Sequence, residues 1–299
     1  MKSGKPGLYM RGKANCHVIG GIVQGASHIR QGKPCQDAIV LTELPDGTII
    51  VAIADGHGSD SCPHSKCGAE IATEVASKLL TELVSRPTSD EALRLLNDNK
   101  NDRIPKQLEQ KWKEAVKAHY EANFGPEPFS FLLYGSTLIA IAVTPEFTFA
   151  LQIGDGDLLM VNEDGIVSQI LPPEYTAVGE ETESLCQSEA WKYVRSCILP
   201  QKRSETSPMF MVSTDGYAKG FANTAGFHKA AADFYRLLSE EGPEKIHDEL
   251  EQWLRLSSDR GSGDDIALAL IFTEEANDNT SKKIKRKRKR KEKHDGKMQ

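Results

Sequence analysis

The sequence contains no apolar run that approaches the ~20 residues needed to cross a membrane. Its first residues, MKSGKPGLYMRGKAN, also lack the apolar core of a signal peptide. Cysteine is scarce, with 6 in 299 residues and no dense spacing, which argues against a disulfide scaffold and indicates reduced thiols. These absences predict a cytoplasmic protein, and the 39% hydrophobic content is sufficient for the core of one large domain or two small ones.

A zinc site is also poorly supported. Cys62, His64 and Cys67 form a C-x-H-x2-C cluster, but a structural zinc ion takes four ligands and normally needs a second pair elsewhere. The sequence offers no obvious second pair, so we expect no zinc at this cluster.

Four aspartates occupy small-residue turns at widely separated points of the chain. Asp55, Asp155 and Asp215 each follow an apolar stretch, and Asp264 comes just before one. Alternation and β-branched content predict that these stretches are strands. They span residues 49–53, 147–153, 209–212 and 266–272. In an antiparallel arrangement, strand exits and a strand entry can share one end of a sheet, so the four carboxylates can converge.

Taken singly, each of these aspartates could be an ordinary turn residue, because Asp-Gly is a common turn dipeptide. Taken together, converging carboxylates repel one another and are costly to desolvate, so they usually need a cation. Oxygen ligands suit Mg2+, Mn2+ or Ca2+ better than zinc or copper. The pattern therefore favours a site for hard divalent ions.

The order of six short motifs carries a family resemblance. They are Ser27-His28 with Cys35-Gln36-Asp37-Ala38, then Ala54-Asp55-Gly56-His57-Gly58, Gly135-Ser136-Thr137, Gly154-Asp155-Gly156-Asp157, Ser213-Thr214-Asp215-Gly216-Tyr217 and Gly263-Asp264-Asp265-Ile266. In this order they resemble the metal-dependent protein serine/threonine phosphatases, the PPM or protein phosphatase 2C family, and look closest to its bacterial branch. The resemblance implies an α+β fold, a four-layer α-β-β-α sandwich of two antiparallel sheets flanked by helices, over residues 1–273.

The resemblance also implies a binuclear Mn2+ or Mg2+ centre. Asp55 would bridge both ions and the carbonyl of Gly56 would complete one shell, while Asp215 and Asp264 would hold the other ion. Asp37 would orient metal-bound water without binding the ions directly.

Two further positions match the family pattern. Asp155 matches the residue that helps to bind a third ion in bacterial members, and His57 matches the residue thought to donate a proton to the leaving serine or threonine oxygen. The chemistry suits these residue types, because paired divalent ions activate water for attack at phosphorus. An imidazole with a pKa near ~6.5 can protonate a departing alkoxide. The plainer alternative for His57 is a polar loop histidine.

The sequence departs from the family pattern at two positions. Gln36 stands where many members have an acidic residue that reaches a metal through water, and Gly32 stands where they have an arginine that grips the phosphate. Glutamine accepts hydrogen bonds without charge, and a glycine cannot supply the bidentate fork of an arginine. Phosphate binding would then fall to the metals, to His28 or Arg30, or to another group.

The rest of the chain predicts helices grouped beside strands, which indicates two sheets flanked by helices. Apolar residues at helical spacing predict helices over residues 65–85, 104–123, 224–240 and 243–256. Further strands are expected over residues 130–143, 158–162 and 166–170. The polar, glutamate-rich residues 172–188 are expected to form a flap beside the site.

The C-terminal residues 274–299 form a separate, strongly basic tail. Residues 282–299 contain 11 Lys or Arg and 2 Asp or Glu, a net charge of +9, so residues 1–281 carry −15 of the total of −6. Such a block is expected to be disordered. It could bind nucleic acid, an anionic membrane surface or an acidic partner, or serve only as a solubilising tail.

Three functions are consistent with these patterns. The favoured one is a metal-dependent phosphatase that acts on phosphoserine or phosphothreonine in proteins and opposes a kinase. The second is a weakly active or inactive regulatory or scaffold protein on the same fold, suggested by Gly32 and Gln36. The third is a nucleic-acid binder that uses the tail.

Overall fold

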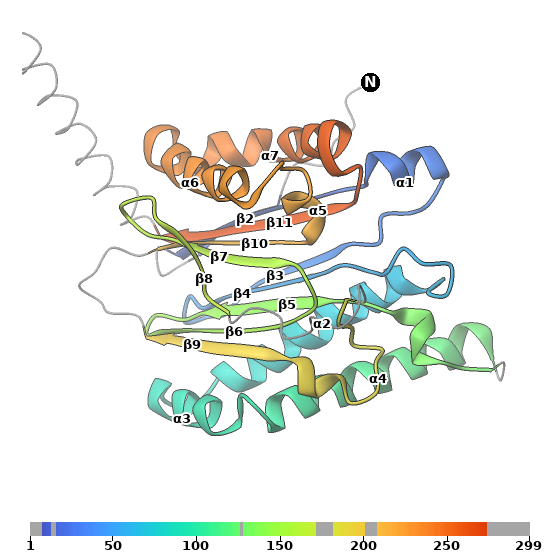
Figure 1. The fold of residues 1–299 in the computed structure, drawn as a ribbon. Coiled ribbons are helices and arrows are strands. Elements are labelled where there is room, and N and C mark those ends of the chain that lie inside the picture. The colour runs from blue at the N-terminus through green and yellow to red at the C-terminus, as the bar shows by residue number, and fades with distance from the viewer. Residues whose placement is uncertain (1–7, 13–15, 126–127, 172–181, 201–207, 274–299) are drawn as a thin grey trace, which may run out of the picture.

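The computed structural model describes residues 8–12, 16–125, 128–171, 182–200 and 208–273. Two antiparallel sheets face each other, and helices cover their outer faces (Figure 1). In the described residues one sheet has the strand order β1-β2-β11-β10-β7-β8 and the other the order β3-β4-β5-β6-β9. The four-layer α-β-β-α sandwich predicted for this chain is therefore confirmed.

The strands of the first sheet are β1 (Leu8–Arg11), β2 (Cys16–Val23), β7 (Asp157–Val161), β8 (Val167–Gln169), β10 (Met209–Ser213) and β11 (Ile266–Thr273). Those of the second are β3 (Ala38–Glu43), β4 (Ile49–Ala54), β5 (Leu138–Val143), β6 (Phe147–Ile153) and β9 (Arg195–Pro200). The helices are α1 (Ala26–Gln31), α2 (Ser65–Val84), α3 (Ser89–Asn99), α4 (Arg103–Phe124), α5 (Asp215–Ala218), α6 (Thr224–Glu241) and α7 (Pro243–Ser257).

Strand β4 shows how one sequence serves two layers at once. All six of its residues are buried. Successive side chains of a strand point to opposite faces, and both faces of β4 are covered. Ile50 and Ala52 pack into the core beneath the helices, whereas Val51 and Ile53 pack into the core between the two sheets. Burial on both faces explains why this stretch is a continuous apolar run rather than an alternating one.

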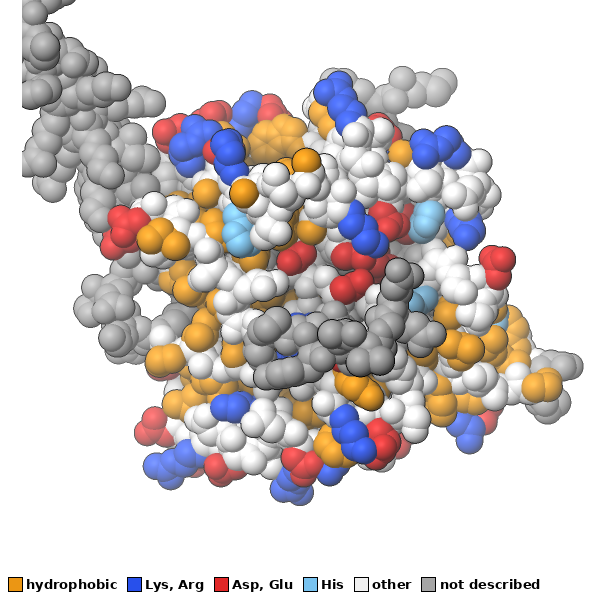
Figure 2. Space-filling view, in the orientation of Figure 1, with side chains coloured by type: hydrophobic (Ala, Val, Ile, Leu, Met, Phe, Trp, Pro, Cys, Tyr) orange, Lys and Arg blue, Asp and Glu red, His pale blue; other side chains and the backbone are white. Residues whose placement is uncertain are grey.

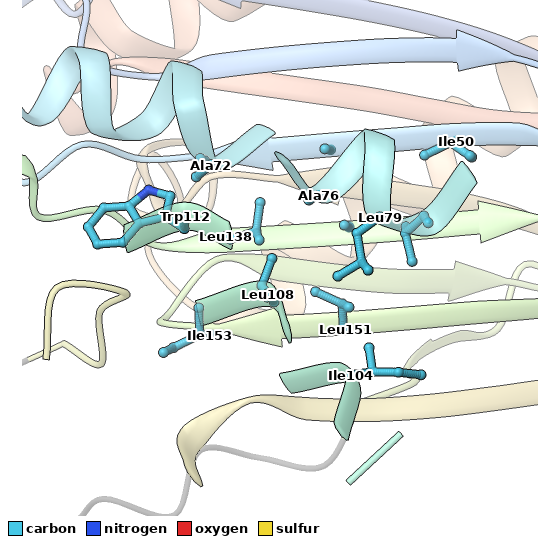
Figure 3. Close-up of a cluster of buried hydrophobic side chains, with 14 of the residues drawn as sticks. Ile50, Ala72, Ala76, Leu79, Ile104, Leu108, Trp112, Leu138, Leu151 and Ile153 are labelled. Carbon is cyan, nitrogen blue, oxygen red and sulfur yellow. The ribbon is translucent and has the colours of Figure 1, made fainter. Parts of the chain in front are cut away.

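Helices α2 and α4 cover the second sheet through a large apolar core (Figure 3). Trp112 of α4 is fully buried, and its indole Nε1 donates a hydrogen bond to the carbonyl of Gly68 at 3.1 Å. A side chain at Gly68 would have its Cβ 2.0 Å from the Tyr134 carbonyl oxygen. Glycine is therefore required where α2 passes the backbone of Tyr134. Helices α6 and α7 cover the first sheet in the same way (Figure 1).

The sequence-based expectation included no strand at the positions of β1, β2, β3 and β9. Two other local elements also differ from it. The strand expected over residues 130–143 begins as a 3-10 turn, Phe131–Tyr134, before β5 starts at Leu138. Ser130 starts this turn by accepting a hydrogen bond from the Leu132 amide through its hydroxyl, a local contact that competes with strand pairing. Helix α3 was not predicted, although Thr88 caps it by accepting from the Glu91 amide at 3.2 Å.

Three further expectations can be placed against the structure. The imidazole of His64 stacks on Phe124, with ring centroids 4.3 Å apart, so this member of the cysteine-histidine cluster is used in aromatic packing. No helix in the described part of the chain is long and apolar enough to span a bilayer. Most of the expected flap, residues 172–181, and the whole tail, residues 274–299, lie outside the described residues.

Candidate functional site

The four aspartates singled out by the sequence line one pocket of about 220 Å3. Asp55 follows β4, Asp155 lies two residues after β6, Asp215 begins the helical turn after β10, and Asp264 precedes β11 by two residues. His57 and Gly56 lie in the same lining. Figure 2 shows acidic side chains gathered near the middle of this face, with basic and histidine side chains beside them.

The backbone that carries Asp55 is fixed from both sides. Its amide donates to the Thr137 hydroxyl at 3.0 Å, and the Thr137 amide donates back to the Asp55 carbonyl at 2.9 Å. The Gly56 amide donates to the carbonyl of Gln36 at 3.2 Å. A Cβ at Gly56 would lie 2.7 Å from the Ser65 carbonyl group, so only glycine allows this close approach of loop and helix.

Asp215 is largely buried, and its Oδ1 has no hydrogen-bond partner among the described residues. The next residue, Gly216, packs directly against the backbone that follows Asp264. A Cβ at Gly216 would lie 2.0 Å from the carbonyl oxygen of Asp265, so a side chain there would push the two aspartates apart. A buried carboxylate oxygen without a donor is costly. This oxygen is therefore well suited to bind a cation.

Burial and mutual repulsion disturb the ionisation of the carboxylates. Burial first, and then the charges of Asp37, Asp215 and Asp264, raise the pKa of Asp55 well above its usual range. Burial and Asp155 raise the pKa of Asp215 to about 6, with Lys219 opposing them. Such shifts mean that the fold buries these carboxylates and places them close together, at a cost that Lys219 does not fully offset.

Lys219 lies inside this acidic group, and sequence reasoning did not find it. Its Nζ is 2.6 Å from Asp215 Oδ2 and 3.5 Å from Asp264 Oδ2. Burial lowers the pKa of Lys219, but its hydrogen bond to Asp215 and the nearby carboxylate charges outweigh that effect and raise the pKa. The one available signal was its position four residues after Asp215, which places the two on one side of a helical turn.

His28 also reaches the pocket, through a second aspartate that sequence reasoning missed. Asp265 is buried and accepts hydrogen bonds from the Gly25 amide at 2.6 Å and the Gln36 amide at 2.7 Å. Its Oδ2 also lies 2.8 Å from His28 Nδ1. Because the carboxylate accepts, Nδ1 of His28 donates, and Nε2 is left 3.9 Å from Asp264 Oδ1.

The remaining predicted residues occupy distinct places. Asp37 is buried beside the pocket, with its Oδ2 accepting from the Thr214 hydroxyl at 2.7 Å. Burial raises the pKa of Asp37, against that hydrogen bond. Gln36 donates from Nε2 to the Ser65 hydroxyl at 2.6 Å. Neither Asp37 nor Gln36 lines the pocket, and neither does Gly32 or Arg30.

His57 lies at the pocket with its ring against the backbone of Gly135, where a Cβ would come within 3.0 Å of His57 Cδ2. Burial lowers the pKa of His57, and Asp155 opposes that shift. Its Nε2 is buried and has no hydrogen-bond partner among the described residues. No described residue therefore competes with a ligand for that nitrogen.

The pocket contains carboxylate oxygens that can act as ligands for hard cations, but the described side chains do not form a complete coordination sphere. Among the described residues, no three His, Cys, Asp or Glu side chains are arranged to hold a metal ion as they stand. The unpartnered Asp215 Oδ1 and the repelling carboxylates nevertheless fit divalent ions of the Mg2+ and Mn2+ class.

Residues 24–255 match the family model described as protein phosphatase 2C. The chain belongs to the protein phosphatase 2C family. No curated protein sequence matches this phosphatase 2C chain.

Solved structures show the same phosphatase 2C fold. The catalytic domain of the serine/threonine protein phosphatase PstP in complex with two manganese ions is 15% identical, with a TM-score of 0.55, over 86% of this chain and 97% of that one. Stp1 from Staphylococcus aureus is 13% identical, with a TM-score of 0.56, over 91% and 99%. The S. agalactiae serine/threonine phosphatase is 19% identical, with a TM-score of 0.54, over 86% and 99%.

Proposed function

We propose that this chain is a metal-dependent protein phosphatase that hydrolyses phosphoserine and phosphothreonine. The observation that carries the proposal is the convergence of Asp55, Asp155, Asp215 and Asp264 on one pocket in a phosphatase 2C fold. Asp55, the Gly56 carbonyl, Asp215 and Asp264 would hold two Mn2+ or Mg2+ ions. When bound, such ions supply Lewis acidity and activate water for attack at phosphorus.

His57 is the proton donor in this proposal. His57 lines the pocket together with Asp55, and its Nε2 has no hydrogen-bond partner among the described residues, so it can donate to the oxygen of a departing serine or threonine. Burial lowers the pKa of His57, so its protonated form is a stronger acid than an ordinary imidazolium. That property favours proton transfer to a departing alkoxide, which is a strong base.

Asp37 and Asp155 support the site from two sides. Asp37 is close enough to raise the pKa of Asp55, and its hydrogen bond from Thr214 fixes its orientation, so it can accept a hydrogen bond from water next to the ligands. Asp155 Oδ2 accepts from the Thr182 hydroxyl at 3.0 Å. This hydrogen bond holds Thr182, the first described residue of the segment expected to form a flap, at the pocket.

The test is phosphate release from a phosphothreonine peptide by protein stripped with EDTA and then supplied with Mn2+ or Mg2+. We expect turnover that requires the divalent ion and falls by about a thousandfold or more in Asp215→Asn, because a direct charge-bearing ligand is lost. Asp233→Asn is the matched control, since Asp233 is a partly exposed aspartate that pairs with Lys229 on α6, away from the pocket lining. Metal-loaded, folded protein without turnover would instead support the regulatory or scaffold function.

The remaining parts of the chain enter the proposal separately. We assign residues 1–273 to the phosphatase domain, and residues 274–299 to a basic tail that contacts nucleic acid or an acidic partner. The protein would act in the cytoplasm against a serine/threonine kinase. Deleting residues 274–299 tests the division into a phosphatase domain and a binding tail. Activity on the peptide should persist, whereas binding to DNA and to acidic peptides, measured over a salt series, should fall.

A further inference from the structure

A phosphatase pocket lined by four carboxylates needs positive charge for its substrate as well as for itself. The family resemblance places a phosphate-gripping arginine at the position of Gly32, and here that position has no side chain. Gly32 ends α1 with φ +67°, and a Cβ there would meet nothing within 4 Å. Any side-chain cation that assists divalent ions in binding phosphate must therefore come from another position.

Lys219 is the one Lys or Arg in the pocket lining that the structure describes. Its ammonium group already points among the carboxylates, with Asp215 Oδ2 at 2.6 Å and Asp264 Oδ2 at 3.5 Å. Its side chain is 55% exposed. The stem is therefore not locked by packing, and the ammonium group can change partners without disturbing the core.

Divalent ions and this ammonium group compete for the same oxygen atoms. Ions held by Asp215 and Asp264 would repel the nearby charge of Lys219, because like charges a few ångströms apart are strongly unfavourable. The released ammonium group remains tethered at the pocket by the α5 turn, whose Lys219 amide donates to the Asp215 carbonyl at 2.9 Å. A substrate phosphate that enters the pocket is then an anion within its reach, in addition to Asp155.

The other candidate groups are less suitable. His28 commits Nδ1 to Asp265 and keeps Nε2 beside Asp264. His57 is needed at the leaving oxygen. Lys33, next to Gly32 in sequence, donates from Nζ to the carbonyl of Gly58 at 3.1 Å and does not line the pocket. Arg30 is exposed and also lies outside the lining.

We propose that Lys219 exchanges partners when the site is loaded: it neutralises Asp215 and Asp264 in the metal-free protein and binds the substrate phosphate once divalent ions hold those carboxylates. It thereby takes the role that the family resemblance assigns to an arginine at the position of Gly32. This inference rests on the proposed function, since it requires a divalent-ion site that accepts a phosphate group.

The test measures binding of inorganic phosphate to Mn2+-saturated protein by calorimetry, which does not depend on turnover. The variants are Lys219→Met, Lys219→Arg, the rival Lys33→Met and the control Lys229→Met. Lys229 is a matched control because its Nζ lies 2.6 Å from Asp233, four residues away, on the exposed face of α6. The affinity for Mn2+ is measured for each variant in a parallel titration.

Lys219→Met is expected to weaken phosphate binding by about tenfold, the effect of one partly solvated, charge-assisted hydrogen bond. The same change should tighten Mn2+ binding, because a competing cation is removed. Lys219→Arg should restore most of the phosphate affinity, and Lys33→Met and Lys229→Met should leave it unchanged.

Unchanged phosphate affinity in Lys219→Met, with tighter Mn2+ binding, would overturn the inference and leave Lys219 as a counter-ion only. A loss confined to Lys33→Met would also overturn it. Absence of phosphatase turnover is a separate result: phosphate binding that depends on Lys219 in an inactive protein would support the inference while contradicting the proposed function.

Discussion

The adjacent residues Asp264 and Asp265 should respond in opposite ways to the same substitution. Asp265 is buried, and its carboxylate takes hydrogen bonds from Gly25, Gln36 and His28. Asp264 has a side chain that is 34% exposed, and its charge contributes to the raised pKa of Asp55. Asp265 holds the fold together, whereas Asp264 adds repulsion at Asp55 that Lys219 only partly offsets until divalent ions bind.

The magnitudes follow from these contacts. Hydrogen bonds to a charged group contribute about 1.5–3 kcal/mol each, and the amide of Asn would present donor hydrogens to at least one of the three donors. We therefore expect Asp265→Asn to lower the free energy of unfolding by about 3–5 kcal/mol, a large part of the roughly 5–15 kcal/mol of a typical domain. In EDTA, Asp264→Asn should change it by less than about 1 kcal/mol, with either no loss or a gain.

The assay is urea unfolding followed by tryptophan fluorescence, in EDTA and again with Mn2+. In Mn2+ the wild type should be stabilised and Asp264→Asn should lose most of that stabilisation, because the ligand rather than the fold has been changed. If the two variants lose the same stability in EDTA, the hydrogen-bond account of Asp265 is wrong. A destabilised Asp264→Asn in EDTA would refute the claim that its charge is repulsive in the metal-free protein.

Three further outcomes are expected. His57→Gln should slow hydrolysis of a phosphothreonine peptide by about 100-fold or more but that of p-nitrophenyl phosphate much less, because nitrophenolate leaves without a proton; equal losses would argue against a proton donor. Burial and neighbouring carboxylates raise the pKa of Asp215 and of Asp157 to about 6. Between about pH 4 and 6 the folded metal-free protein therefore keeps protons that the unfolded chain has released. The free energy of unfolding should fall as the pH rises through this range. Thermal melts in EDTA should therefore show a higher melting temperature at pH 5 than at pH 7, and no such difference would contradict the shifts. His28→Ala should weaken Mn2+ binding by no more than a few fold while leaving the fold intact, since its contact with Asp265 is one of three; unfolding in EDTA would show instead that His28 is structural.

The sequence located the carboxylates for a physical reason. Asp55, Asp155, Asp215 and Asp264 each follow or precede an apolar strand, and strand ends in an antiparallel sandwich can be placed from the pattern of the strands themselves. The boundaries of β6 and the start of β11 agree with the prediction to the residue. Apolar residues at helical spacing likewise located α2, α4, α6 and α7 to within a residue or two.

The groups that the sequence did not reveal depend on contacts between distant segments. Asp265 is one residue beyond Asp264 in the same motif, and only the start of β11 beside α1 turns its carboxylate toward Gly25 and His28. Lys219 resembles any exposed lysine in sequence, and its role depends on where Asp264 lies.

The turn at Phe131–Tyr134 was missed for a local reason. The Ser130 hydroxyl accepts from the Leu132 amide, and this contact competes with the strand propensity of the residues that follow.

The central claim is that the carboxylates at these strand ends hold divalent ions that make the pocket a phosphatase. The most direct measurement is calorimetric titration of Mn2+ into EDTA-stripped protein, with phosphate release from a phosphothreonine peptide recorded across the same Mn2+ concentrations, for wild type and Asp55→Asn. We expect two ions to bind, activity to follow their binding, and Asp55→Asn to weaken binding by about 100-fold or more and abolish turnover. Full activity in the stripped protein, or Mn2+ binding that is unchanged in Asp55→Asn, would contradict the claim.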